Sequence, residues 1–266
     1  MNNLFDFAAK CLFTHSVEGK LAATHQAWQL HMAQQLCMES TDSPLPIANT
    51  AFPEKPEWLM PRDMPRRSLN TEAGKLAFFH ALAHIEFMAI NLAWDIIYRF
   101  RGLPPEFYSD WLRIADEEAQ HFSLIRTHML SLGVDYGDLP AHRGLWLQAE
   151  DTANNLLARL AVVPRCMEAR GLDVTPAMID KLKGMNDNAG VDILTRIYQD
   201  EIGHVERGSY WFKRLAIEQG QEPESCFAKL LLTYIGKPKG PFNREVRIIA
   251  GFSHNEIDWL EAGLHE

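Results

Sequence analysis

The sequence has few of the residues that disulfide scaffolds and zinc ribbons require. It contains 4 cysteines among 266 residues, at positions 11, 37, 166 and 226, and no two of them form a C-x-x-C pair. Cysteines scattered in this way argue against both kinds of cross-linked fold. We therefore expect free thiols and a reducing compartment, the cytoplasm.

Basic residues are outnumbered. The chain has 26 Lys and Arg against 35 Asp and Glu, a formal net charge of −9. This balance argues against a purely electrostatic nucleic-acid binder, although a local basic patch is compatible with it. The N-terminal stretch MNNLFDFAAKCLFTHS lacks the basic start and the uninterrupted apolar run of a signal peptide.

No long apolar run is free of polar residues. The most apolar stretch, LAFFHALAHIEFMAINLAWDII, carries His80, His84, Glu86, Asn91 and Asp95. Polar side chains at this density argue against a membrane span. His80 and His84 lie one turn apart but off the face of Glu86, and we interpret them as partly buried structural residues.

Strands are missing from the expected structure, because no segment alternates with period two for long enough. Apolar residues at helical spacing instead predict four long helices, over 71–101, about 106–132, roughly 151–170 and about 190–218. Shorter helices are expected within 3–38, near 176–187, near 223–235 and at the C-terminal end. Helix and central strand are excluded from the segment with prolines 44, 46, 53, 56, 61 and 65, which predicts an extended strap.

We expect an all-α protein that forms one compact domain. Residues 1–69 would supply two helices and the strap packed on the body, and 70–220 a four-helix bundle. Residues 221–266 would add a C-terminal helical extension. Apolar residues of the strap, such as Phe52 and Trp58, favour packing.

Two of the long helices carry the same polar pair on an otherwise apolar face. ADEEAQHF contains Glu118 and His121, and YQDEIGHVERGSYWF contains Glu201 and His204. Side chains three residues apart project from one side of a helix, so an oxygen and a nitrogen can hold one ion. A buried carboxylate without a partner is costly. A shared metal site would satisfy both pairs, and a metal-free buried polar network is the alternative.

The first long helix offers a third carboxylate, Glu86, on its apolar face. Glu86 precedes the predicted helix end by roughly 22 Å, and Glu118 follows the start of the next helix by roughly 18 Å. An antiparallel hairpin would therefore bring the two carboxylates to a similar level.

The third long helix offers Glu168, which we prefer over Glu150. Glu150 lies at the predicted helix start, where acidic residues are common because of the helix dipole. Glu168 lies near the predicted helix end, so the 171–189 segment must absorb an offset from Glu201, for example by continuing the helix. Pro164 is expected to kink the helix.

With AHIEFMAINLAWD and PRCMEARGLD, these motifs resemble the ferritin-like di-iron carboxylate superfamily, and more closely an uncharacterised bacterial branch of it. The resemblance covers most of residues 70–252 and implies a four-helix bundle with two iron ions, or manganese or a mixed pair. It implies that Glu118 and Glu201 bridge the two ions. The full implied ligand set is Glu86, Glu118, His121, Glu168, Glu201 and His204. The strap and the C-terminal segment depart from the family pattern and leave the substrate open.

An acidic residue precedes the glutamate of each motif. In related oxygenases such a residue hydrogen-bonds the histidine of the opposite helix, so the resemblance implies Asp200–His121 and Glu117–His204 pairs. Arginines at 113, 196 and 207 are equally good partners for these two acids on exposed faces.

Three further residues are candidates for a role at the site, one in catalysis and two in contact with a substrate. Tyr198 lies one turn before Glu201 and is either a catalytic redox or hydrogen-bonding group, or part of the core. Asn243 and Arg247, in KPKGPFNREVRIIAGF, would contact an anionic substrate or an RNA backbone. Helix capping and surface solvation explain this stretch equally well.

The resemblance thus implies a di-iron oxidoreductase, hydroxylase-like or oxygenase-like, that activates O₂ or peroxide. Its substrate would be a small molecule or an RNA, the latter by analogy with a superfamily member that hydroxylates a modified tRNA base. An electron-donor protein is an expected partner, and we expect a monomer or small homo-oligomer. The alternatives are a ferroxidase or iron-handling protein without an organic substrate, and a metal-free helical binding protein.

Overall fold

The computed structural model describes residues 2–40, 43–45, 47, 51–65 and 67–262. Within these ranges every regular element is a helix, apart from isolated bridges at Asn3–Cys37 and Trp58–Ala141, so the all-α prediction is confirmed. The chain divides into two compact units, Met1–Trp146 and Leu147–Glu266, and each is described by itself. The predicted division into 1–69, 70–220 and 221–266 stays a prediction. Pro46 and the strap positions 48–50 and 66 lie outside the described residues.

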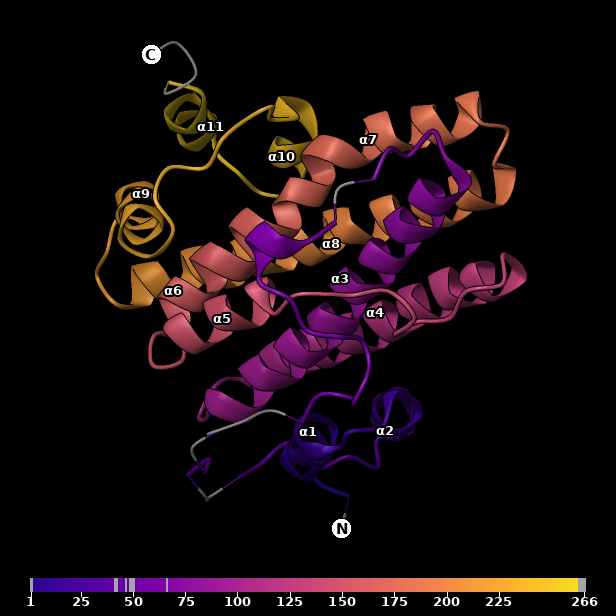
Figure 1. Ribbon diagram of the computed structural model, residues 1–266. Helices are drawn as coiled ribbons and strands as arrows, with labels where there is room; N and C mark the ends of the chain where they lie inside the picture. The colour runs from indigo at the N-terminus through magenta and orange to yellow at the C-terminus, as the bar shows by residue number, and fades with distance from the viewer. Residues whose placement is uncertain (1, 41–42, 46, 48–50, 66, 263–266) are drawn as a thin grey trace. The chain divides into compact units, whose positions relative to one another are not determined.

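Unit 1 is built on a helical hairpin of α3 (Glu72–Arg99) and α4 (Pro105–Ser131), as predicted. Helices α1 (Leu4–Phe13) and α2 (Val17–Met32) pack against this hairpin (Figure 1). The start of α3 is capped by Thr71, whose hydroxyl accepts a hydrogen bond from the Gly74 amide at 3.0 Å. Gly102, at φ +73°, lies in the turn that follows α3, and the Pro105 ring begins α4.

Helix α3 is the central helix of this unit. By length and composition it is apolar enough to cross a membrane, but 67% of its most apolar window is buried inside the structure. Burial of this kind is the property of a core helix in a soluble protein.

A buried lysine joins the N-terminal helices to α3. Lys20 is 0% exposed, and its Nζ donates to the carbonyl of Cys11 at 2.6 Å and to Asn91 Oδ1 at 2.8 Å. Burial lowers the pKa of Lys20 to about 8, because desolvation disfavours the charged ammonium. Trp94 Nε1 donates to the hydroxyl of Thr24 at 2.8 Å, which adds a second polar contact at this junction.

The described part of the strap packs on unit 1, beside the loop that follows α4. The ring of Phe52 lies 5.1 Å from that of Trp58 and 5.8 Å from that of Trp146, centroid to centroid. The Leu59 amide donates to the carbonyl of Ala141 at 2.8 Å. Phe52 and Trp58 therefore make contacts within unit 1, whereas Leu45, which was also expected to favour packing, is exposed.

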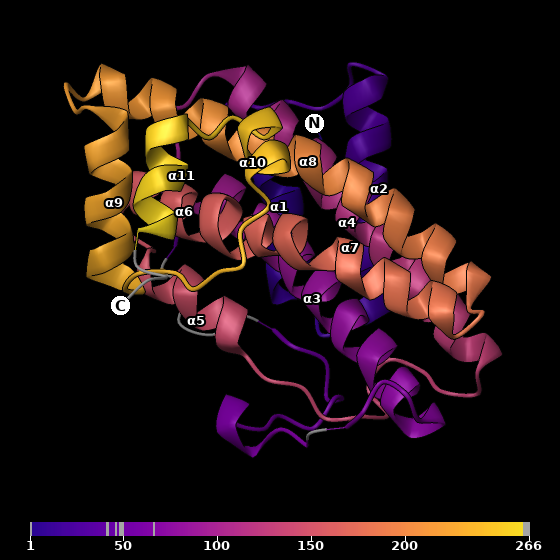
Figure 2. The same ribbon diagram turned by 90° about the horizontal axis from the view of Figure 1, so that it is seen from above.

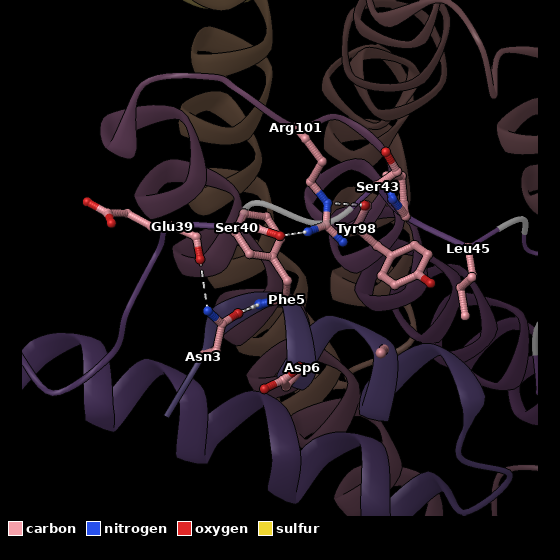
Figure 3. Close-up of a pocket in the computed structure, with 11 residues that line it drawn as sticks. Asn3, Phe5, Asp6, Glu39, Ser40, Ser43, Leu45, Tyr98 and Arg101 are labelled. Carbon is pink, nitrogen blue, oxygen red and sulfur yellow. Dashed lines mark hydrogen bonds between the residues drawn. The ribbon is translucent and has the colours of Figure 1, made fainter. Parts of the chain in front are cut away.

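The N-terminal end of the strap is more open. Leu45 is 74% exposed and lines a cavity of about 490 Å³ together with Phe5, Tyr98 and Arg101 (Figure 3). The Arg101 guanidinium lies 3.9 Å from the centre of the Phe5 ring and donates to the Ser40 hydroxyl at 2.8 Å.

Unit 2 is built on a second antiparallel pair, with α8 (Asn188–Glu218) as one member (Figure 2). The other member is continuous and consists of α6 (Leu156–Val162), a π-helical turn η2 (Val163–Glu168) and α7 (Ala169–Gly184). The short helix α5 (Gly144–Asp151) precedes it. The C-terminal helices are α9 (Pro223–Tyr234), α10 (Arg244–Ile249) and α11 (His254–Glu261), as expected.

The predicted bounds of the third long helix, 151–170, were wrong at both ends. The helix begins at Leu156, after the Asn155 side chain caps it, and α7 runs on to Gly184. Pro176 was interpreted as the start of a separate helix, yet it lies inside α7. A proline leaves the carbonyl four residues earlier without its helical donor. Here that carbonyl, of Leu172, accepts a hydrogen bond from Asn243 Nδ2 at 3.4 Å.

Candidate metal centre

Unit 1 brings three of the predicted ligands together, namely Glu86 from α3 and Glu118 and His121 from α4. Each offers one ligand atom, and these atoms lie within 4.8 Å of one another. His121 Nδ1 is 3.4 Å from Glu86 Oε2 and 3.4 Å from Glu118 Oε2. Donors that share one first-row metal at about 2.0–2.2 Å lie roughly 3 Å apart. The group is therefore compact enough to hold an ion.

The electrostatics of this group favour a bound cation. Burial, and then the neighbouring Glu118 charge, raise the pKa of Glu86 well above its usual range. Glu86 Oε2 makes no hydrogen bond of normal geometry with the described residues. A cation beside it would offset both the carboxylate repulsion and the cost of burial. The donor chemistry thus fits a metal.

Aromatic side chains and neutral histidines pack next to these ligands along α3 and α4. The Phe122 ring lies 5.8 Å from the Phe87 ring and 5.1 Å from the Tyr136 ring, centroid to centroid. Burial lowers the pKa values of His80 and His84 to about 4, so both imidazoles are neutral at pH 7. His84 Nδ1 lies 3.0 Å from the Tyr136 hydroxyl, and His80 Nε2 accepts from the backbone of the same loop. Both histidines, expected to be partly buried, are buried and contact neighbours within unit 1, and their structural role stays a prediction.

Unit 2 repeats the glutamate–histidine geometry on α8. His204 Nδ1 lies 3.6 Å from Glu201 Oε1, so the histidine again turns its Nδ1 toward the glutamate one turn earlier. The His204 side chain is 0% exposed and that of Glu201 is 13% exposed. The two motifs therefore present matching donor pairs, one in each unit.

Glu168 closes the π-helical turn of unit 2 and is partly buried. The turn approaches α8 at Gly208, where an added Cβ would lie 2.5 Å from Pro164 Cβ. Glu168 follows Pro164 by four residues and His204 precedes Gly208 by four, so an antiparallel pair places Glu168 level with His204. Both are equally far along the chain from Asn186, in the turn between α7 and α8. The longer helix thus removes the offset, while Glu150 is exposed on α5.

The acidic residues before the two motif glutamates differ in their surroundings. Asp200 Oδ2 lies 3.8 Å from Arg196 Nε on the same helix, which is the alternative pairing predicted for this acid. Glu117 is partly buried on α4. The proposed hydrogen bonds of these acids to the ligand histidines stay predictions.

The candidate catalytic residue Tyr198 and the candidate substrate contacts Asn243 and Arg247 have partners within unit 2. Arg247 is buried, and its Nε and Nη2 donate to the two oxygens of Asp173, each at 2.8 Å. The Asn243 amide donates to Asp173 Oδ1 at 2.8 Å, and Asn243 Nδ2 donates to the Tyr198 hydroxyl at 3.4 Å. These contacts explain the motif structurally, and roles in substrate binding or catalysis stay predictions.

Sequence reasoning missed a second buried ion pair in the same unit. Arg165 Nη2 donates to both carboxylate oxygens of Glu256, each at 2.8 Å, and both side chains are almost completely buried. An arginine among the apolar residues of the third long helix was the available signal, but its partner is far away in sequence.

Comparison with known proteins gives the family. A family model described as "Protein of unknown function (DUF455)" matches residues 13–258. An uncharacterized protein of Haemophilus influenzae (strain ATCC 51907 / DSM 11121 / KW20 / Rd) is 48% identical over 218 residues, which cover 79% of this chain and 76% of the relative. No solved structure matches the sequence significantly. The chain therefore belongs to the family described as "Protein of unknown function (DUF455)".

Proposed function

We propose that this protein is a cytoplasmic oxidoreductase of the ferritin-like di-metal type. The observation that carries the proposal is the repeated glutamate–histidine geometry, at 3.4 Å in α4 and 3.6 Å in α8. Two iron ions, or manganese or a mixed pair, would be bound, with Glu118 and Glu201 as bridges. The proposed ligands are Glu86, Glu118, His121, Glu168, Glu201 and His204.

The donor set is compatible with iron or manganese. Carboxylates suit manganese and other hard cations, imidazole suits iron, and the proposed set holds no thiolate. When bound, such a pair of ions supplies redox chemistry with O₂ or peroxide toward an organic substrate.

The chain itself contributes proton control and exclusion of water. Burial, and then the neighbouring Glu118, raise the pKa of Glu86, so metal binding, which requires the carboxylate, would be coupled to proton release. The side chains of Glu118 and His121 are 0% exposed, so water is kept from this half of the site. A small molecule or an RNA as substrate, and an electron-donor protein, are the partners that this function requires.

Metal analysis tests the proposal. The purified protein is loaded with Fe(II) without oxygen, desalted and analysed for iron per chain. We expect about two ions in the wild type and in the exposed-site control Glu150→Ala, and none in a Glu118→Ala/Glu201→Ala double variant. The proposal is wrong if the wild type binds no more iron than the double variant.

Addition of O₂ then separates an oxygenase from a ferroxidase. A transient optical absorption at a fixed ratio of two irons per chain, in a small oligomer on a sizing column, supports the oxidoreductase. Continued oxidation of many irons per chain by a large closed oligomer would instead identify an iron-handling protein.

A further inference from the structure

Unit 2 contains two buried ion pairs that the proposed chemistry does not use. Besides Glu256, the Arg165 guanidinium contacts the Ser209 hydroxyl, with Nε at 3.2 Å. Its central carbon also lies between 4.2 and 4.7 Å from three ring centres, those of Phe212, Phe227 and Phe252. Arg165 is thus fixed in position from several sides.

The second pair holds the other side of the π-helical turn. The Arg247 guanidinium donates two parallel hydrogen bonds to the Asp173 carboxylate, and its Nη2 also donates to the carbonyl of Ala169 at 3.3 Å. Ala169 directly follows Glu168, and Arg165 lies three residues before Glu168. The two pairs therefore hold residues on both sides of the proposed ligand.

Glu256 and Arg247 both come from one C-terminal segment, residues 243–256, and pair with Arg165 in the π-helical turn and with Asp173 in α7. This segment is pressed onto α8, since a Cβ added at Gly251 would lie 2.9 Å from Ser209 Cβ. Lys213 Nζ donates to the Gly251 carbonyl at 2.6 Å. The segment thus bridges α8 and the π-helical turn within unit 2.

The energetics of such pairs suggest a geometric purpose. Burying two charges costs about as much as their attraction returns, so a buried pair contributes little net stability compared with apolar residues. π-helical turns are rare and frequently occur at functional sites. Two buried pairs around one such turn are therefore better explained by the geometry that they enforce.

We propose that the Arg165–Glu256 and Arg247–Asp173 pairs position Glu168 for metal binding. The C-terminal segment clamps the π-helical turn and keeps Glu168 level with Glu201 and His204. This inference rests on the proposed metal site and assigns the four charged residues as positioning residues.

The test removes one clamp without leaving a stranded charge. In an Arg247→Met/Asp173→Leu variant both charges are replaced by apolar side chains, which proteins often tolerate. The matched control is Arg244→Met/Asp258→Leu, because Arg244 lies on the same helix α10 but pairs with Asp258 on the surface, at 2.6 Å. Circular dichroism and unfolding midpoints in chelator establish that both variants are folded.

The readout is metal affinity, measured by competition with a chelator of known strength for Fe(II) and Mn(II). We expect one of the two bound ions to be held roughly 10-fold to 100-fold more weakly in the clamp variant, as when groups that orient metal ligands are lost. The control should bind both ions as the wild type does. Unchanged affinity in a folded clamp variant would overturn the inference and leave the metal site standing.

Two further outcomes are decisive. A wild type that binds no more metal than Glu118→Ala/Glu201→Ala would overturn the metal site and this inference together. If the clamp variant does not fold, Arg247→Lys decides, because lysine keeps the charge but lacks the two-pronged grip. The affinity for one of the two ions should fall in this variant, and wild-type affinity would contradict the inference.

Discussion

At the scale of single residues, the buried carboxylate of Glu86 is destabilising in its charged form, and a bound cation would offset that cost. This carboxyl is buried beside Glu118, and its pKa in the folded protein is raised. Between the unfolded and folded pKa values the folded protein binds more protons than the unfolded chain. The free energy of unfolding therefore falls as pH rises through the folded pKa. The metal-free protein is destabilised at neutral pH by the same residue that would bind the metal.

Glu86→Gln should therefore stabilise the metal-free protein and impair metal binding. Glutamine has nearly the same shape but no charge to bury, so we expect a gain on the order of 1 kcal/mol or more at pH 8 in chelator, and a smaller gain at pH 5. Chemical denaturation at the two pH values measures the gain, and iron analysis measures binding. Wild-type iron content in this variant would contradict the role of Glu86 as a ligand.

Lys20 gives a pH dependence of the opposite sign. Its folded pKa is about 8 against 10.5 for the free side chain, so above pH 8 the unfolded chain binds more protons and stability rises with pH. Relative to Lys20→Met, the wild type should gain about 1 kcal/mol in unfolding free energy between pH 7 and pH 9. Denaturation of both proteins at the two pH values tests this.

The range from pH 7 to pH 9 and the reference variant Lys20→Met isolate the titration of Lys20. Burial raises the pKa of the neighbouring Cys11 thiol to about 11, which opposes the lysine effect above pH 9. The hydrogen bonds lost in Lys20→Met change stability equally at both pH values. A difference between the two proteins that does not vary with pH would show that Lys20 is charged throughout.

At the scale of helices, the closest contact in unit 2 is that of Gly208 with Pro164. Gly208→Ala would place a methyl group 2.5 Å from the proline ring, so we expect a loss of roughly 1–3 kcal/mol from overpacking. Gly203→Ala is the matched control, since the same helix has nothing within 4 Å there. It should gain roughly 0.5–1 kcal/mol. Thermal unfolding in chelator measures the stability of both variants. A Gly208→Ala variant that is more stable than the wild type would contradict the close approach of Gly208 to Pro164.

The long helices were predictable because their signals are local. Apolar spacing, the Thr71 cap and the Gly102 turn define α3, and the same reasoning gave α4 and α8 to within a few residues. The third long helix was mispredicted because Pro176 usually begins or breaks a helix. The donor that compensates for it, Asn243, lies far away in sequence, and no local pattern reveals it.

The candidate site likewise has features that local sequence predicts and features that depend on tertiary contacts. The twin motifs were visible because three-residue spacing places both side chains on one helical face, and unit 1 confirms that Glu86, Glu118 and His121 lie together. The level of Glu168 follows from the extension of α7 to Gly184, which the sequence analysis offered as one way to absorb the offset, whereas the π-helical turn was not predicted. The partners of Arg165 and Arg247 are tertiary contacts, which helix periodicity does not contain.

At the scale of the whole molecule, the proposed ligands come from both units. A ligand that binds only the folded protein raises stability by about 2.7 kcal/mol at one hundred times its dissociation constant. Mn(II) should therefore raise the unfolding midpoint of the wild type in a concentration-dependent manner.

The same titration tests the proposed ligand roles of Glu86 and Glu168. Glu86→Gln and Glu168→Gln should each reduce the shift in midpoint, because each would remove one proposed donor. Glu150→Gln should leave the shift intact. A shift that survives one of the two ligand substitutions unchanged would contradict the role of that residue as a ligand.

The π-helical turn also affects how relatives of this chain are compared with it. A π-turn accommodates one more residue than an α-turn, so it changes the angular phase of every side chain after it by about 100°. A homologue without this turn would have to carry the carboxylate that corresponds to Glu168 one position earlier to keep it on the same face. An alignment that ignores the extra residue would therefore place another residue opposite Glu168 and miss the carboxylate that corresponds to this proposed ligand.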